Sequence, residues 1–302
     1  MSKIKTTIGG QAVMEGIAMR GPKQTCLAIR LPDGNIHTEL SPTTENPFQR
    51  IPLLRGAAAM VLSLASGYRF LMRSSDLCLP EGEEDAFDRW VKKHFGEDNK
   101  LLPAIIGILA GFLSIALFVL LPTVITGLLS KLLPFLIKFR TVIESLLKVL
   151  IFILYIYYSS KIPDIARVFR YHGAEHKTIF CYENREPLTV ENVKKYGRFH
   201  PRCGTSFMFI TLLISIVIFS FVPWTSTFTR VLYKLLCLPL IMGISYEFIR
   251  YAGAHDNLLS RLLSAPGLWI QRLTVFEPDD SMIEVAIASL IPVIPEEKGD
   301  TQ

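Results

Sequence analysis

The strongest constraint on the fold of this 302-residue chain is a set of four long apolar blocks. They cover residues 101–121, 141–160, 206–222 and 231–251. Each is close to the roughly 20 residues that a helix needs to cross the hydrocarbon core of a bilayer. Half of the chain (50%) is hydrophobic although 20% is charged, and the blocks carry the excess. The sequence therefore predicts a mainly α-helical, polytopic membrane protein with about four transmembrane helices.

The basic residues predict how these helices are oriented. Lys and Arg gather before the first block and over residues 161–202, while Lys131, Lys138 and Arg140 lie between the first two blocks and weaken the contrast. Short segments rich in Lys and Arg stay in the cytoplasm. We therefore expect a multi-pass protein of the cell membrane with both termini, and residues 161–205, on the cytoplasmic side.

The segments outside the blocks have weaker patterns. Residues 122–139 are apolar but interrupted by Pro and Lys, which favours an interfacial hairpin outside the membrane or a re-entrant loop. Residues 26–31 and 35–40 alternate around a Pro-Asp-Gly turn, which predicts a small N-terminal β-hairpin. Residues 51–73 have an apolar helical pattern, typical of an amphipathic helix on the membrane surface or packed under the bundle.

Further short elements complete the expected organisation. The charged segment 81–100 is expected to be a solvated linker with a short helix, residues 266–273 and 278–290 are expected to be helices, and residues 295–302 a disordered tail. The expected regions are a cytoplasmic N-terminal region (1–100), two transmembrane helices with an outer hairpin (101–160), a cytoplasmic loop (161–205), two transmembrane helices (206–251) and C-terminal helices with a tail (252–302).

The candidate chemistry centres on an H-x-x-E-H box, HGAEH, at residues 172–176. On a helix, His172 and His176 share a face and can hold a divalent metal such as zinc. Glu175 beside them can take a proton from metal-bound water, the arrangement of the inverted zincins. Gly173 weakens a helix, so we expect the box at a helix start.

More candidate ligands occur near the box. His200 and Cys203 form an H-x-x-C pair before the third block, and His255 follows the fourth. Glu247 is an acid inside an apolar block, where a charge is costly. It either faces the bundle interior as a ligand or acid/base group, or simply pairs with Arg250 three residues later.

Two metal-site hypotheses remain open. In a catalytic site, the box histidines and one of Glu247, His200 or His255 bind zinc and leave a position for water. In a structural site, the box histidines, His200 and Cys203 close a four-ligand shell. The alternative to both is that the histidines are polar residues at the membrane interface without any metal.

A glycine-rich segment near the N-terminus, residues 9–21 (GGQAVMEGIAMRG), holds one acid and one base, Glu15 and Arg20. It lacks the ending of a P-loop and the spacing of a dinucleotide fingerprint. It is either an active-site loop that places both residues near the metal or a packed structural turn. Arg20 or Arg202 would then contact an oxyanion or phosphate of the substrate.

Four motifs together identify a resemblance: residues 9–21, 171–179 (YHGAEHKTI), 200–207 (HPRCGTSF) and 246–250 (YEFIR). The chain resembles the YqhQ-like family of bacterial membrane proteins over nearly its whole length. The resemblance implies a domain of unknown function described as predicted metal-dependent enzymes. It supports His172, Glu175, His176, His200 and Cys203 as motif positions and names no substrate.

These patterns favour a zinc-type metal-dependent hydrolase at the cytoplasmic face of the bilayer, acting on a small molecule, a lipid or a peptide. A non-enzymatic scaffold or assembly factor with a structural metal site is the alternative. A transporter is less favoured, because carriers usually have repeated broken helices around a midplane site. The net charge is +5, and the Lys and Arg residues that produce it flank the apolar blocks without forming a long basic run with interleaved aromatic residues. We therefore expect no nucleic-acid partner. A homo-oligomer is compatible with these features.

Overall fold

The computed structural model describes residues 6–78, 101–201, 203–255 and 257–295. The chain divides into two compact units, which are treated separately below. Unit 1 comprises Met1–Leu79, Ile156–Ile214 and Pro239–Gln302, and unit 2 comprises Pro80–Tyr155 and Ser215–Leu238. The expected helix over residues 81–100 and the expected tail lie outside the described residues, apart from the first residue of the tail.

Unit 1 contains a four-stranded antiparallel sheet in the order β1-β2-β3-β4. Its strands are β1 (Gly9–Val13), β2 (Gly16–Arg20), β3 (Gln24–Arg30) and β4 (Ile36–Pro42). The predicted hairpin is confirmed as β3 and β4. The glycine-rich segment, expected as a loop or turn, instead supplies β1 and β2.

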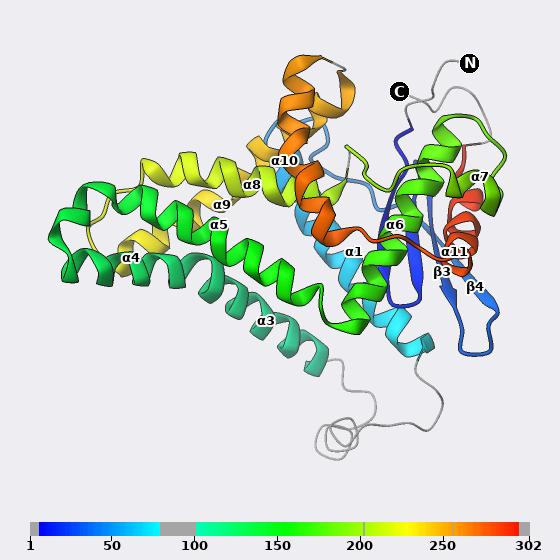
Figure 1. The fold of residues 1–302 in the computed structure, drawn as a ribbon, viewed down its shortest axis with the longest axis horizontal. Helices are drawn as coiled ribbons and strands as arrows, with labels where there is room; N and C mark the ends of the chain where they lie inside the picture. Colours follow the sequence, from blue (N-terminus) through cyan, green and yellow to red (C-terminus); the bar gives the residue numbers. More distant parts are fainter. Residues whose placement is uncertain (1–5, 79–100, 202, 256, 296–302) are drawn as a thin grey trace. The chain divides into compact units, whose positions relative to one another are not determined.

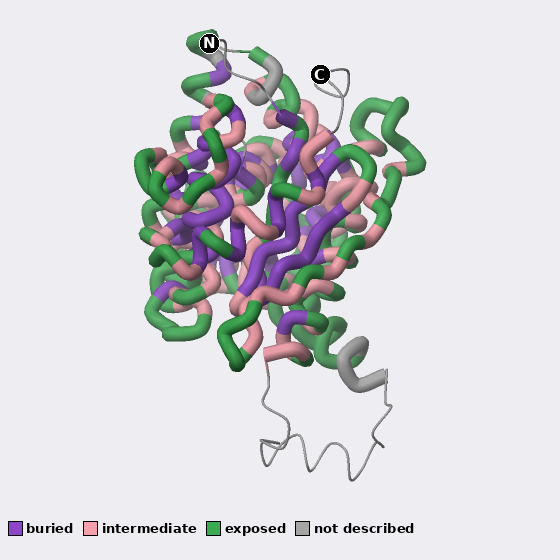
Figure 2. The backbone as a smooth tube through the Cα atoms, turned by 90° about the vertical axis from the view of Figure 1, so that its right-hand side faces the viewer, coloured by how far each residue is buried: buried purple, intermediate pink, exposed green. Residues whose placement is uncertain are grey.

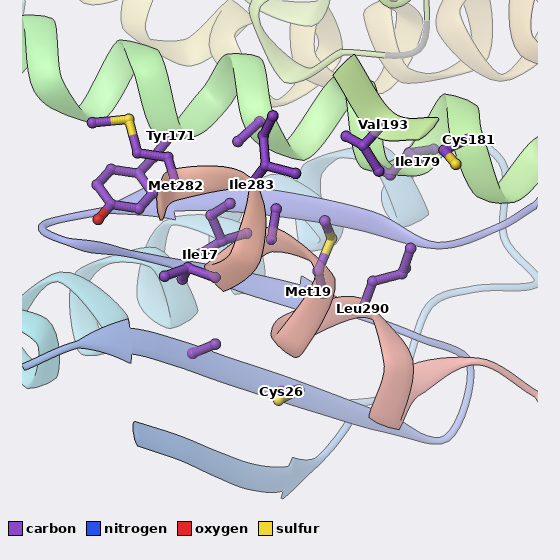
Figure 3. Packing of buried hydrophobic residues seen from close by; sticks show 14 of the residues in the cluster. Ile17, Met19, Cys26, Tyr171, Ile179, Cys181, Val193, Met282, Ile283 and Leu290 are labelled. Atoms are coloured by element: carbon purple, nitrogen blue, oxygen red, sulfur yellow. The ribbon is translucent and has the colours of Figure 1, made fainter. Parts of the chain in front are cut away.

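Both faces of this sheet are covered, which follows from the alternation of side chains along its strands. Ile17 and Met19 of β2 belong to one buried cluster with helices α6 (Pro163–Glu183) and α11 (Asp280–Leu290). Ala18, between them, faces the other way with Val13, and Phe70 of helix α1 (Leu54–Cys78) packs there. Figure 3 shows the first cluster between the sheet and the two helices, and the buried trace follows the strands in Figure 2.

The helices of unit 1 confirm three predicted elements. These are α1 (Leu54–Cys78), α10 (Leu258–Thr274) and α11 (Asp280–Leu290). α10 begins eight residues before the prediction because Asn257 caps it, its side chain accepting from the Ser260 amide at 2.8 Å. The remaining elements of this unit that do not extend into unit 2 are α6 (Pro163–Glu183), α7 (Val190–Lys194) and η3 (Ile291–Val293). α6 and α11 lie on the same face of the sheet (Figure 1).

A continuous helical run opens the described part of unit 2. It consists of α3 (Leu101–Ile115), the π-helical segment η1 (Ala116–Leu120) and α4 (Leu121–Leu132). The 3-10 segment η2 (Pro134–Phe139) follows. The prediction of a hairpin over residues 122–139 is therefore wrong. Pro122 lies in the first turn after the π-helical segment, whose wider spacing accommodates the missing N–H and the proline ring.

Three more helices contain the other apolar blocks, and two helical runs are long and apolar enough to cross a membrane. The helices are α5 (Arg140–Ser159), α8 (Gly204–Ser220) and α9 (Thr227–Ala254). The two runs are Ile105–Leu132, with 28 residues, and Thr227–Ala252, with 26. α8 is apolar but has only 17 residues, and α5 carries Arg140, Glu144 and Lys148. Four spans are thus not confirmed.

Candidate metal centre

Two histidines and a cysteine from separate segments meet in unit 1. His172 and His176 lie one turn apart on α6, and Cys203 directly precedes α8. One ligand atom from each lies within 4.8 Å of the others. His172 Nε2 is 3.1 Å from Cys203 Sγ, and the two imidazole centroids are 4.5 Å apart. No other group of three such side chains occurs in the part of the chain that the structure describes.

Backbone carbonyls fix the orientation of both imidazoles. Nδ1 of His172 lies 3.0 Å from the carbonyl oxygen of Thr274, and Nδ1 of His176 lies 2.6 Å from that of Arg198. A carbonyl oxygen only accepts, so each Nδ1 is the donor, and in a neutral ring Nε2 keeps its lone pair. Metal-bound histidines usually have such a partner on their other nitrogen.

The electrostatic surroundings also suit metal binding. Burial is the main cause that lowers the pKa of His176, with a further contribution from His172, so this ring is neutral near pH 7. The Thr205 amide donates to Cys203 Sγ at 3.4 Å, and the Thr205 hydroxyl lies 3.2 Å from the same sulfur. Donors of this kind commonly surround the ligand atoms of a metal site. A set of two imidazoles and a thiolate fits zinc.

The box lies within α6 and not at a helix start, so that prediction is wrong. A Cβ atom at Gly173 would collide with the carbonyl oxygen of Phe276 and lie 3.2 Å from Pro278 Cδ. The Phe276 amide donates to the Phe169 carbonyl at 2.9 Å, which holds this segment along α6. Glycine here permits a close backbone approach, and that approach places Thr274 beside His172.

Glu175 belongs to the box but not to the group of three ligands. Its carboxylate is buried, and Oε1 accepts from the Gly10 amide of β1 at 3.0 Å. Oε2 is also buried and has no hydrogen-bond partner among the described residues. Desolvation, the largest cause, raises the pKa of Glu175 against the opposing effects of His172 and the Gly10 amide. Glu175 therefore places in the box a carboxylate with one oxygen that forms no hydrogen bond to a described residue.

The glycine-rich segment contributes to the site through its backbone. A Cβ at Gly10 would lie 2.8 Å from Glu175 Cδ, so the close approach requires glycine. Glu15, at φ 49° in the β1–β2 turn, pairs with Arg167 and accepts from the Tyr171 hydroxyl at 3.1 Å. The structure thus gives Glu15 an anchoring contact with α6.

Of the two arginines expected to contact substrate, the structure describes only Arg20. Arg20 donates to the Thr44 carbonyl at 2.6 Å in an exposed position. Arg202 lies outside the described residues. Their substrate-binding roles stay predictions.

His200 is held near the centre without joining it. Its Nε2 is 3.7 Å from Glu183 Oε2, and its ring centroid is 5.6 Å from that of His176. The Gln271 side chain accepts from the His200 amide at 2.8 Å and donates to its carbonyl at 2.7 Å. Gln271 of α10 therefore fixes the backbone at His200.

Two further ligand candidates from the sequence also have other partners. Glu247 pairs with Arg55 of α1, and not with Arg250 as the alternative interpretation expected. His255 is exposed and stacks on Tyr251 at a centroid distance of 4.3 Å. Neither belongs to the group formed by the two box histidines and the cysteine.

Comparisons with known proteins identify a family and a relative, and neither is described with an activity. Residues 51–296 match the family described as "Protein of unknown function (DUF1385)". The chain is 38% identical over 293 residues to "Uncharacterized protein YqhQ" of Bacillus subtilis (strain 168), covering 95% of this chain and 92% of the relative. No solved structure gives a significant match.

Proposed function

The chain belongs to the DUF1385 family of unknown function, and from that premise we propose that it is a membrane-associated, zinc-dependent hydrolase whose site faces the cytoplasm. The observation that carries the proposal is the convergence of His172, His176 and Cys203 with both Nδ1 atoms engaged by carbonyls. The distribution of Lys and Arg and the two long apolar helical runs support the location.

The number of ligands supports a catalytic site over a structural one. Zinc in proteins is usually four-coordinate, and three protein ligands are typical of sites that keep a position for water or substrate. His200, the fourth ligand of the structural hypothesis, lies near Glu183 and outside the three-ligand group. When bound, zinc supplies Lewis-acid activation of water.

Glu175 is the residue that we propose to move the proton. Gly10 fixes one carboxylate oxygen, and the other is the atom that would receive the proton. The raised pKa of this carboxyl brings it closer to neutral pH, where a general acid-base group works best. The backbone contacts of His172 and His176 keep both rings in place during this transfer.

The metal site is tested by metal analysis of the purified full-length protein. We expect about one zinc per chain in the wild type, and a near-complete loss in the His172→Ala, His176→Ala double variant, because two of three ligands are removed. His255→Ala is the matched control and should keep the metal. His200→Ala should also keep it. A double variant with unchanged zinc content would refute the site.

The hydrolase role is tested by Glu175→Gln. We expect this variant to keep its zinc but to hydrolyse chromogenic esters and phosphoesters about 100-fold or more slowly than the zinc-loaded wild type, because the proton acceptor is lost. Equal rates with equal zinc content would remove the base role. Wild-type protein with zinc but no hydrolysis of any of these compounds would favour the scaffold hypothesis.

A further inference from the structure

Unit 2 contains a buried cluster of charged side chains among apolar helices. Glu144 of α5 accepts from Arg230 of α9 at 2.6 Å and also pairs with Lys234. Arg230 is fully buried and Lys234 is 2% exposed. The Thr123 hydroxyl lies 2.6 Å from Glu144 and 2.9 Å from Lys234. A single carboxylate is therefore the negative partner of two buried cations.

A third cation lies beside this pair without a carboxylate of its own. Lys148 follows Glu144 by one turn of α5, and its Nζ donates to Ser215 Oγ at 2.5 Å. It also lies 4.6 Å from the centroid of the Phe219 ring. Glu144 is the sole acidic residue in the described part of unit 2, and it is occupied by Arg230 and Lys234. The cluster thus has an excess of positive charge.

Three of these charged residues line a small pocket in the same unit. Glu144, Lys148 and Lys234 share it with the hydroxyl residues Thr141 and Ser145. The π-helical segment η1 contributes to the apolar part of the wall, and such segments often mark functional positions. Uncompensated charge in an apolar environment is costly, so the half-buried Lys148 beside two buried cations favours an anion as ligand.

We propose that this pocket binds an anionic phosphate group, with Lys148 as its principal contact and the hydroxyl of Thr141 as a further donor. Lysine and hydroxyl donors are suited to phosphate oxygens. The phosphate comes from the headgroup of a membrane lipid or from free phosphate. The apolar wall favours the lipid, because an acyl chain can lie along it while the headgroup meets the cations.

The test compares lipids with the same acyl chains on the full-length protein in a non-ionic detergent. Native mass spectrometry measures binding of phosphatidylglycerol and of diacylglycerol, and a thermal-shift titration measures binding of inorganic phosphate. We expect phosphatidylglycerol to bind more tightly than diacylglycerol. Lys148→Met should reduce that affinity about tenfold or more, because a charged hydrogen bond to phosphate is lost.

Matched variants make the outcome decisive. Lys131→Met removes an exposed lysine of the same unit and should leave binding unchanged, and Lys148→Arg should retain most of it. Saturable binding of inorganic phosphate that Lys148→Met abolishes would identify free phosphate as the source. The proposal is overturned if the wild type binds neither phosphatidylglycerol over diacylglycerol nor phosphate, or if Lys148→Met has no greater effect than Lys131→Met. A wild type that binds neither ligand overturns the proposal even if Lys148→Met does not fold.

Discussion

Replacing Glu144 by glutamine is expected to destabilise unit 2 more than any other single change considered for it. The substitution keeps the size of the side chain but leaves Arg230 and Lys234 buried without a negative partner. Removing one partner of a buried ion pair typically costs about 3 to 5 kcal/mol. That is a large share of the roughly 5 to 15 kcal/mol that separates most folded domains from the unfolded state.

The effect of Glu144→Gln should be visible in thermal unfolding and in size-exclusion profiles of the detergent-solubilised protein. Glu284→Gln is the matched control, because its ion pair with Arg30 leaves the Glu284 side chain 52% exposed and exposed pairs contribute little. Adding Lys234→Met to Glu144→Gln should recover part of the lost stability, since one of the stranded cations is then removed. A melting temperature equal to that of the wild type would contradict the buried network.

Gly173→Ala is expected to damage both stability and the metal centre. The added methyl group would meet the carbonyl oxygen of Phe276, a backbone atom that cannot move aside as the end of a flexible side chain can. Overpacking of this kind costs about 1 to 3 kcal/mol. As the segment is pushed from α6, the Thr274 carbonyl should leave His172, so we also expect a lower zinc content.

The control for that substitution is Gly197→Ala, because a Cβ atom at Gly197 has no neighbour within 4 Å. Circular dichroism melts and metal analysis of both variants measure the difference. If Gly173→Ala and Gly197→Ala had the same melting temperature and the same zinc content, the proposed close contact between α6 and the backbone at Phe276 would be refuted.

The helix of the metal centre shows what local sequence can and cannot predict. The spacing of His172 and His176 predicted a shared helix face, and the structure has both on α6. Gly173 was interpreted through its low helix propensity, yet tertiary contact overrides propensity here. The carbonyls of Thr274 and Arg198 could not have been predicted as partners, because every residue has a carbonyl and only the fold selects these two.

The sheet and the apolar blocks illustrate the same limit. The sequence does not predict the β1–β2 hairpin, because its glycines favour a loop or turn. In the structure, glycine allows close contact with other atoms, as at Gly10, where the Glu175 side chain packs against the backbone. The block at residues 141–160 was predicted from its apolar residues to cross the membrane. Its charges Glu144 and Lys148 find partners on other helices, which composition alone cannot reveal.

The centre also has a consequence for when it can form during synthesis. Gly10 binds Glu175 from near the start of the chain, whereas Thr274 holds His172 from near its end. A growing chain therefore lacks the hydrogen-bond partner of His172 until all of α10 has left the ribosome. The three ligands are therefore synthesised before the contact that orients His172, so the arrangement is completed late in synthesis.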